Sequence, residues 1–297
     1  MADFEFRQEF DFDQRDLEKP PHHLPCAAIA VLWGDFILTS GSRPSEFTPT
    51  AMRAKMEKAY TIYTDLLALP ELKAQLQGET CLLAVDIIMH TTRTRPVVYN
   101  AWTLLAEATG LHYVDGSVTQ AQLDFMRDIS SVSTDKSRNV PLYACSLQDA
   151  VYRLDALSCE QQRPLASVIA YQGHTIAVVA FYVNDTMSLY YAVDSLPGRM
   201  LVSANKLHFC FELLSDWLRP YDGPVSTQPD ADTTRTGVYQ CVGNGAYTMS
   251  IYYITPVPNL PPPRDPSPPP PAVARKAART ARSVATPKSA VDGRSDE

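Results

Sequence analysis

One cysteine of the chain stands where a thiol can become a nucleophile. Cys26 directly follows Pro25, and the run from Ala27 to Leu38 is apolar and long enough for a buried helix. The sulfur then lies at the positive end of a helix, where the thiolate is stabilised and the pKa of the thiol falls. The alternative is an inert core thiol, because cysteine is among the most buried residue types.

A histidine and an aspartate that could serve such a thiol come later in the chain. The β-branched and aromatic runs His174–Tyr182 and Met187–Val193 are separated by Asn-Asp, which predicts a hairpin with its turn at residues 184–186. In that register His174 lies opposite Ser195 and beside Asp194. The two side chains are therefore expected at one end of the hairpin.

Such a pair suits general-base catalysis. A carboxylate that holds the Nδ1 proton of an imidazole orients the ring and keeps it basic, as a thiol nucleophile requires. The chain order Cys26, His174, Asp194 follows the logic of papain-like enzymes. The structural alternative is that His174 caps a strand while Asp194 opens a turn toward Pro197-Gly198.

An amide that could donate to an oxyanion precedes the cysteine. Gln14 stands twelve residues before Cys26, and Gln8 stands eighteen before it. Either side chain could reach the head of the helix and stabilise developing negative charge. The alternative is that both are solvated polar residues of an acidic segment.

Further helices are indicated by capping signals and apolar periodicity. Thr48 and Pro49 form an N-cap and a first-turn proline, and apolar residues then recur at helical spacing to Leu67. Ser146 with Asp149 resembles a capping box before a helical run. The segment Ser203 to Leu218 predicts another amphipathic helix.

Strands gather in the second half of the chain. Besides the hairpin above, the sequence predicts a strand at Leu165–Tyr171 and a final pair, Gly237–Val242 and Ala246–Ile254, joined through Gly-Asn-Gly. Helices first and strands later indicate an α+β domain, with helices packed on an antiparallel sheet, over residues 1–255.

The C-terminal segment has a different composition. Eleven of the 24 prolines lie between Pro256 and Pro287, and Ala, Arg, Ser and Lys follow without an aromatic residue. Such a sequence cannot bury enough apolar surface to offset its ordering entropy. We expect residues 256–297 to form a disordered basic tail or linker, with the run Arg275 to Arg282 as a solvated segment, a localisation signal or a patch for an anionic partner.

Composition excludes several classes of protein. The net charge of −7 argues against nucleic acid as the main partner of the folded domain. The sequence shows neither a secretory signal nor a membrane-spanning run. The six cysteines form no C-x-x-C pair, so we expect reduced thiols, no metal and no cofactor.

The order of motifs resembles the N-terminal cysteine protease domain of the herpesvirus large tegument protein. Short motifs in matching order carry the resemblance: Gln14, Leu24-Pro25-Cys26-Ala27, the helix from Thr48 to Leu67, Leu69-Pro70-Glu71-Leu72, the strand from Leu165, the strand Ser188 to Asp194 with Leu196-Pro197-Gly198, and Tyr247 to Ile254. The resemblance implies a papain-like fold and cleavage of ubiquitin or NEDD8 conjugates. It also implies partners among tegument and capsid-associated proteins, and a location in the virion tegument and the host cytoplasm or nucleus.

One departure from that family bears on activity. The family has its catalytic histidine two residues after the aspartate, and Leu196 stands there in this chain. Either His174 on the neighbouring strand is the base, or the domain is a pseudoenzyme that binds ubiquitin-like modifiers or tegument partners. The hypothesis for an active enzyme makes Cys26 the nucleophile, with His174, Asp194 and Gln14 as its helpers.

A second resemblance competes for the same residues. His174, the hairpin and Val193-Asp194-Ser195 are similar to the His-to-Asp segment of the Ulp and adenain proteases, whose Gln and Cys come later. Here Gln240 and Cys241 are adjacent, whereas that family has several residues between them, and Ala246 stands near the position of its thiol. We rank this alternative second among the catalytic hypotheses.

Overall fold

A computed structural model of the chain describes residues 4–17, 25–40, 44–76, 82–94, 100–111, 120–134, 136–137, 139–171, 174–218 and 246–256. The residues around Cys241 and the predicted tail, apart from its first residue, Pro256, which ends a strand, lie outside this part. The two-part division at residue 255 therefore stays a prediction.

Eight strands form a single sheet in the order β1-β7-β6-β5-β4-β8-β2-β3. Their bounds are β1 (Glu5–Glu9), β2 (Asn100–Leu111), β3 (Leu142–Ala144), β4 (Leu165–Tyr171), β5 (His174–Asn184), β6 (Met187–Ser195), β7 (Gly198–Ser203) and β8 (Ala246–Pro256). Neighbouring strands are antiparallel except β2 and β3, which run parallel. The expected antiparallel sheet is thus corrected to a mixed one.

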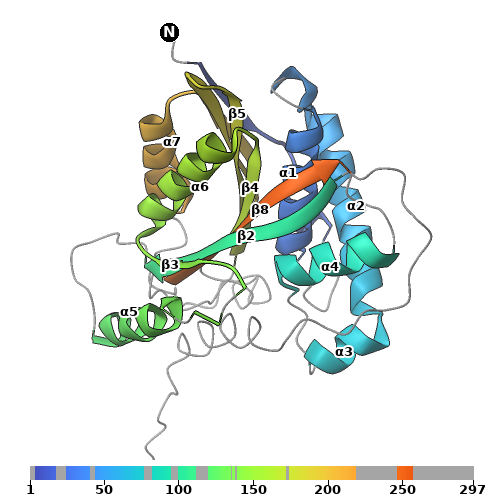
Figure 1. Cartoon of the computed structure of the whole chain (residues 1–297). Coiled ribbons are helices and arrows are strands. Elements are labelled where there is room, and N and C mark those ends of the chain that lie inside the picture. Colours follow the sequence, from blue (N-terminus) through green and yellow to red (C-terminus); the bar gives the residue numbers. More distant parts are fainter. Residues whose placement is uncertain are drawn as a thin grey trace, which may run out of the picture.

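Helices lie on both faces of the sheet, so the α+β class is confirmed (Figure 1). Their bounds are α1 (Cys26–Ser40), α2 (Pro49–Leu67), α3 (Pro70–Leu76), α4 (Ala84–Thr94), α5 (Gln120–Ser133), α6 (Leu147–Gln161) and α7 (Lys206–Glu212), and a π-helical turn at Leu213–Trp217 follows α7. Helix α1 packs on β4, β5 and β6 and is itself covered by α2 and α4. Helices α6 and α7 lie on the opposite face.

Capping explains where three helices begin. Thr48 Oγ1 accepts from the Ala51 backbone N–H at 3.2 Å, and Ser146 Oγ accepts from the Asp149 N–H at 3.1 Å, as their sequences predict. The predicted start at Ser203 is wrong, because Ser203 ends β7 and the helix is capped by Asn205 instead.

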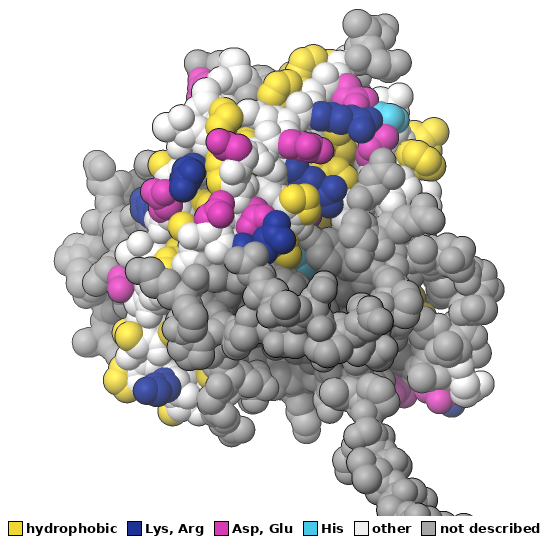
Figure 2. All heavy atoms as spheres, turned by 180° about the vertical axis from the view of Figure 1, so that it is seen from behind, with side chains coloured by type: hydrophobic (Ala, Val, Ile, Leu, Met, Phe, Trp, Pro, Cys, Tyr) yellow, Lys and Arg dark blue, Asp and Glu magenta, His cyan; other side chains and the backbone are white. Residues whose placement is uncertain are grey.

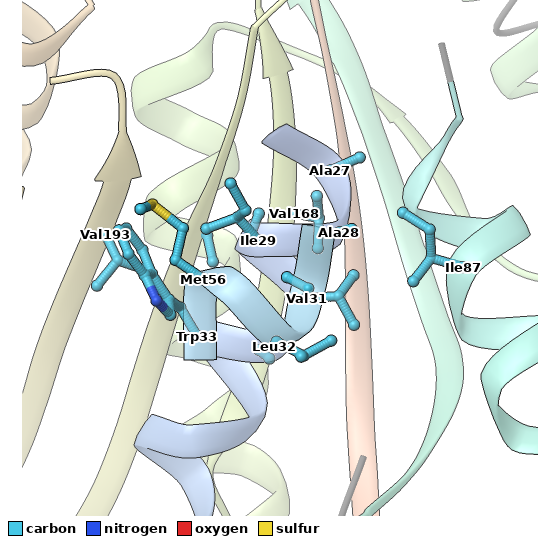
Figure 3. Close-up of a cluster of buried hydrophobic side chains, with 14 of the residues drawn as sticks. Ala27, Ala28, Ile29, Val31, Leu32, Trp33, Met56, Ile87, Val168 and Val193 are labelled. Atoms are coloured by element: carbon cyan, nitrogen blue, oxygen red, sulfur yellow. The ribbon is translucent and has the colours of Figure 1, made fainter. Parts of the chain in front are cut away.

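Each face of the sheet has its own core, because successive side chains of a strand point to opposite faces. Ala177 and Val179 of β5 face the core around α1, whereas Ile176 and Val178 face the core around α6 and α7. Helix α1 is predominantly apolar, and all of its first ten residues are buried, Asp35 among them. Figure 3 shows its side chains packed between Met56, Ile87 and Val193.

The predicted final hairpin is wrong in its pairing. Strand β8 pairs with β2 along its whole length and with β4 from Tyr247 to Tyr253. Neither edge is left for a hairpin partner, and residues 237–242 lie outside the described part. Residues 243–245, the predicted turn, also lie outside the described part.

Charges of both signs alternate on the described part of the face shown in Figure 2. Among the ion pairs of the described residues, Arg7 Nη2 lies 2.9 Å from Glu212 Oε1. Two large apolar side chains of α7, Leu207 and Phe211, are exposed at 68% and 64%.

Candidate active site

The first turn of α1 presents Cys26 at one end of the sheet. The Ile29 N–H donates to the Pro25 carbonyl at 2.9 Å, so the helix begins with Cys26 as its first residue. Proline is well suited to precede the helix here, because its carbonyl accepts the first helical hydrogen bond and it fixes the backbone. The apolar residues behind Cys26 anchor the helix in the core and fix the direction of its N-terminal end.

His174 and Asp194 come together at the same end of the sheet. His174 begins β5 and Asp194 is the penultimate residue of β6, and both are buried. His174 Nε2 lies 2.6 Å from Asp194 Oδ1. The Leu196 backbone N–H also donates to Oδ1, at 2.9 Å.

The register of the hairpin differs by one residue from the predicted one. Ala177 pairs with Val193 and Phe181 with Leu189, and a bulge between Tyr182 and Asn184 takes up the extra residue. A shift of one residue moves a side chain to the other face of a sheet. In the observed register Asp194 shares a face with His174, which the predicted register would not have allowed.

The ring nitrogen that meets the carboxylate also differs from the expected one. Asp194 engages Nε2 and not Nδ1. Cys26 and His174 also influence each other, because each is among the causes that shift the pKa of the other. Since Asp194 occupies Nε2, the buried Nδ1 is the ring nitrogen that remains for the sulfur. The imidazole thus lies between a thiol and a carboxylate, with one nitrogen for each.

Thr175 completes the surroundings of the sulfur. Burial alone would raise the pKa of the Cys26 thiol, but the hydrogen bond and charge of His174, together with side-chain and backbone hydrogen bonds from Thr175, lower it below the ordinary value. The pKa of His174 is raised to about 10, because the charges and hydrogen bonds of Asp194 and Cys26 outweigh burial. This arrangement favours a thiolate beside an imidazolium.

Gln14 is held next to the His–Asp pair through Ser195. The Ser195 hydroxyl donates to Gln14 Oε1 at 2.7 Å, and Gln14 is fully buried. The Phe10 N–H donates to the Gly198 carbonyl at 2.8 Å, which fastens the N-terminal segment to the β6–β7 turn. A solvated Gln14 is therefore wrong. Gln8, the alternative donor, lies in β1 opposite Met200.

Sequence reasoning missed the supporting residues Thr175, Ser195, Arg199 and Trp217. Arg199 Nη2 donates to Asp194 Oδ2 at 3.2 Å and to the Trp217 carbonyl at 2.9 Å. Adjacency to His174 and Asp194 could have pointed to Thr175 and Ser195. Trp217 lies in a π-helical turn that no pattern in the sequence indicated.

The described part of the chain shows no metal cluster and no spanning helix. Within it, no three His, Cys, Asp or Glu side chains gather as a metal ion would need. Among its helices, none combines the length and apolar character of a bilayer crossing. Gln240 and Cys241, the residues of the competing resemblance, lie outside the described residues.

Comparisons with known proteins complete the description. No protein-family model matches the chain, and no curated protein matches its sequence. A solved structure of the ubiquitin-specific protease encoded by a murine cytomegalovirus tegument protein, in complex with a ubiquitin-based suicide substrate, is similar to it with a TM-score of 0.49. The two sequences are 9% identical, over 85% of this chain and 87% of the other.

Proposed function

We propose that the chain is a papain-like cysteine protease domain that removes ubiquitin or a ubiquitin-like modifier from conjugates. The observation that carries the proposal is the convergence of Cys26, His174 and Asp194 at the head of α1. Helix α1 supplies the thiol, and the β5–β6 hairpin, much later in the sequence, supplies the imidazole and the carboxylate, so that the three groups lie in series. A buried histidine with a raised pKa beside a cysteine is the kind of perturbed pair that marks catalytic sites.

The first step is proton transfer within the site. The Cys26 thiol gives its proton to His174 Nδ1, and Asp194 holds the Nε2 proton of the resulting imidazolium. Thr175 stabilises the thiolate by hydrogen bonding. The positive end of α1 acts in the same direction.

The thiolate then attacks the carbonyl carbon of the isopeptide bond. A carbon–sulfur bond forms and the carbonyl oxygen becomes an oxyanion, to which the Gln14 amide donates. Ser195 holds Gln14 by its oxygen, so that the amide N–H groups point away from Ser195. Collapse of this intermediate breaks the carbon–nitrogen bond, and His174 gives its proton to the leaving lysine amine.

Water completes the cycle. His174 takes a proton from the water as its oxygen attacks the thioester carbon. The carbon–sulfur bond breaks, the modifier leaves with a free carboxyl terminus, and the thiolate–imidazolium pair is restored. The sequence of steps is hydrolysis and consumes only water.

The substrate class rests on the resemblance in motif order to the herpesvirus tegument protease domain. On the same ground we assign the domain to a virion tegument, acting in the host cytoplasm or nucleus with other tegument or capsid-associated proteins. The acidic net charge of −7 is compatible with a basic modifier surface.

A second candidate is a pseudoenzyme that binds a modifier without cleaving it. Two observations favour it: Leu196 stands at the family position for histidine, and the side chain of Cys26 is 1% exposed. A thiol so enclosed meets a carbonyl only after the surroundings open.

A modifier carrying a C-terminal propargyl group tests the proposal. We expect ubiquitin-propargylamide or its NEDD8 counterpart to form a covalent adduct with the full chain, seen as a mass increase on a denaturing gel. The adduct should be lost in Cys26→Ala and kept in Cys159→Ala, the matched loss of a thiol on α6. Binding of the modifier without adduct by folded protein would instead support the pseudoenzyme.

The competing nucleophile is tested in the same assay. Cys241→Ala should leave adduct formation unchanged. An adduct lost in Cys241→Ala and kept in Cys26→Ala would overturn the role of Cys26 and favour the Ulp and adenain resemblance.

A further inference from the structure

Arg199 is a cation next to the His–Asp pair whose role the proposed mechanism does not explain. It lies directly opposite Asp194 in the β6–β7 ladder. Its Nη2 donates to Asp194 Oδ2 at 3.2 Å and to the Trp217 carbonyl at 2.9 Å, and its guanidinium lies 4.4 Å from the centroid of the Trp217 ring. The strand, the carboxylate and the π-helical turn are thereby tied together.

The two oxygens of Asp194 have separate tasks. Oδ1 accepts from His174 and from the Leu196 N–H, whereas Oδ2 accepts from Arg199. Arg199 therefore does not compete for the oxygen that His174 uses. It acts on His174 only through the position and the charge of the carboxylate.

The charges of the cluster explain what that influence is. Asp194 is fully buried, and the Arg199 side chain is 15% exposed, so their attraction is screened less than that of a surface pair. The titratable groups that bear directly on His174 are Cys26 on α1 and Asp194 on β6, with Arg199 on β7 beyond the carboxylate. With Arg199 charged, a thiolate–imidazolium pair leaves the buried cluster neutral.

We propose that Arg199 is a positioning residue, which fixes Asp194 against the turn that ends at Trp217 and limits how strongly Asp194 holds the proton of His174. Without this second cation, Asp194 would hold the imidazolium more tightly. His174 would then release its proton less readily to the leaving amine. The catalytic part of this role rests on the proposed function, whereas the influence on His174 does not.

The test measures the titration of the His174 imidazole directly and needs no substrate. In a Cys26→Ala background the imidazole titrates without the thiol, and NMR of the ¹³C-labelled histidine rings follows it, with the signal assigned by His174→Gln. Adding Arg199→Met, which keeps an apolar stem over Trp217, should move the titration midpoint of His174 upward by about one pH unit. Arg199→Lys keeps the charge and should stay near the background value.

Arg163→Met is the matched control. Arg163 also stacks on an aromatic ring, with its guanidinium 4.3 Å from the centroid of Tyr253, and it bonds to the Gln161 amide oxygen instead of a carboxylate. We expect no shift of His174 in this variant. If Arg199→Met does not fold, Arg199→Gln serves in its place.

An unchanged or lower midpoint in a folded variant without the Arg199 charge would overturn the proposal, as would equal shifts in Arg199→Lys and Arg199→Met. The propargyl assay on the chain with Cys26 intact is read separately. If no adduct forms with any variant, the proposed function fails while the NMR midpoint still decides the role of Arg199.

Discussion

Two thiols of this molecule lie near carboxylates, yet their surroundings act in opposite directions. Burial opposes ionisation of Cys26 at the start of α1, but the influence of His174 and Thr175 lowers the pKa of its thiol below the ordinary value. Cys159 near the end of α6 lies 3.7 Å from Asp155 Oδ1 and 3.9 Å from Ser188 Oγ. Burial and the negative charge of Asp155 raise its pKa.

The difference shows what activates a thiol in this fold. Cys26 is at the positive end of its helix and Cys159 is near the negative end. His174 stands between Cys26 and its carboxylate, whereas Asp155 faces Cys159 directly. Near Cys159 the available cation, Lys206, pairs with Asp155 at 2.6 Å and so does little for the sulfur. A carboxylate close to a thiol helps only through an intervening base.

Removing that base should give the largest effect. His174→Ala should slow adduct formation with the propargyl probe by about 10²- to 10⁴-fold, because general-base help is lost and the pKa of Cys26 rises. The alkylation rate of Cys159, followed by peptide mass spectrometry, should not change. A wild-type rate in His174→Ala would break the comparison, since Cys26 would then react without its base.

Substitutions at two glycines distinguish a loss of site geometry from a loss of overall stability. A Cβ at Gly198 would lie 2.0 Å from the Phe12 carbonyl oxygen, and one at Gly110 would lie 2.0 Å from that of Cys145. Each glycine-to-alanine change should cost about 1–3 kcal/mol of the free energy of unfolding, measured in urea. Only Gly198→Ala should also slow adduct formation, because it displaces the segment that carries Gln14. Equal rates in both variants would count against a role for Gln14.

The raised pKa of His174 predicts how stability depends on pH. A group whose pKa is higher in the folded state contributes stability that is complete below its ordinary value, 6.5, and is lost as pH rises toward the folded value, about 10. The difference in unfolding free energy between Cys26→Ala and Cys26→Ala/His174→Gln should therefore fall between pH 6 and pH 10. The fall is complete before pH 10, because this background lacks the contribution of Cys26. A difference that does not depend on pH would show that His174 is not held as a cation.

The smallest effect is expected at the other thiol. Asp155→Asn removes the charge that faces Cys159 while keeping an oxygen for Tyr190 and Lys206, which now lie 2.8 and 2.6 Å from Asp155 oxygens. Alkylation of Cys159 at pH 8 should become faster by less than about tenfold, since burial still opposes ionisation. Slower alkylation would mean that Asp155 does not raise the pKa of Cys159.

Local signals in the sequence predicted much of the fold. Four features depend on residues close together in the chain, and the structure confirms the elements that they predict. They are the apolar run after Pro25, the caps at Thr48 and Ser146, and the turn residues between β5 and β6. The same local reasoning placed His174 and Asp194 at one end of a hairpin, because a hairpin brings together residues close in the chain, but the predicted register put their side chains on opposite faces of the sheet. The catalytic roles assigned to them stay a prediction.

Long-range pairing lay beyond such reasoning. Strand β1 has no strong apolar alternation and is held by β7, which lies almost two hundred residues later. The local sequence around β8 predicts one strand of a hairpin, but β2 and β4 pair with both edges of β8. The one-residue bulge between Tyr182 and Asn184 has no evident signal in the sequence, and it set the face of the sheet on which Asp194 lies.

The site is assembled from both ends of the folded chain, and this has a consequence for its synthesis. Gln14 and Ser195 are 181 residues apart in the sequence, and Arg199 contacts Trp217, which lies later still in the chain. Contacts of such sequence separation form late in folding. Until β6 has been synthesised, the chain has no Asp194 to hold His174, so the surroundings that lower the pKa of the Cys26 thiol are complete only when the sheet is.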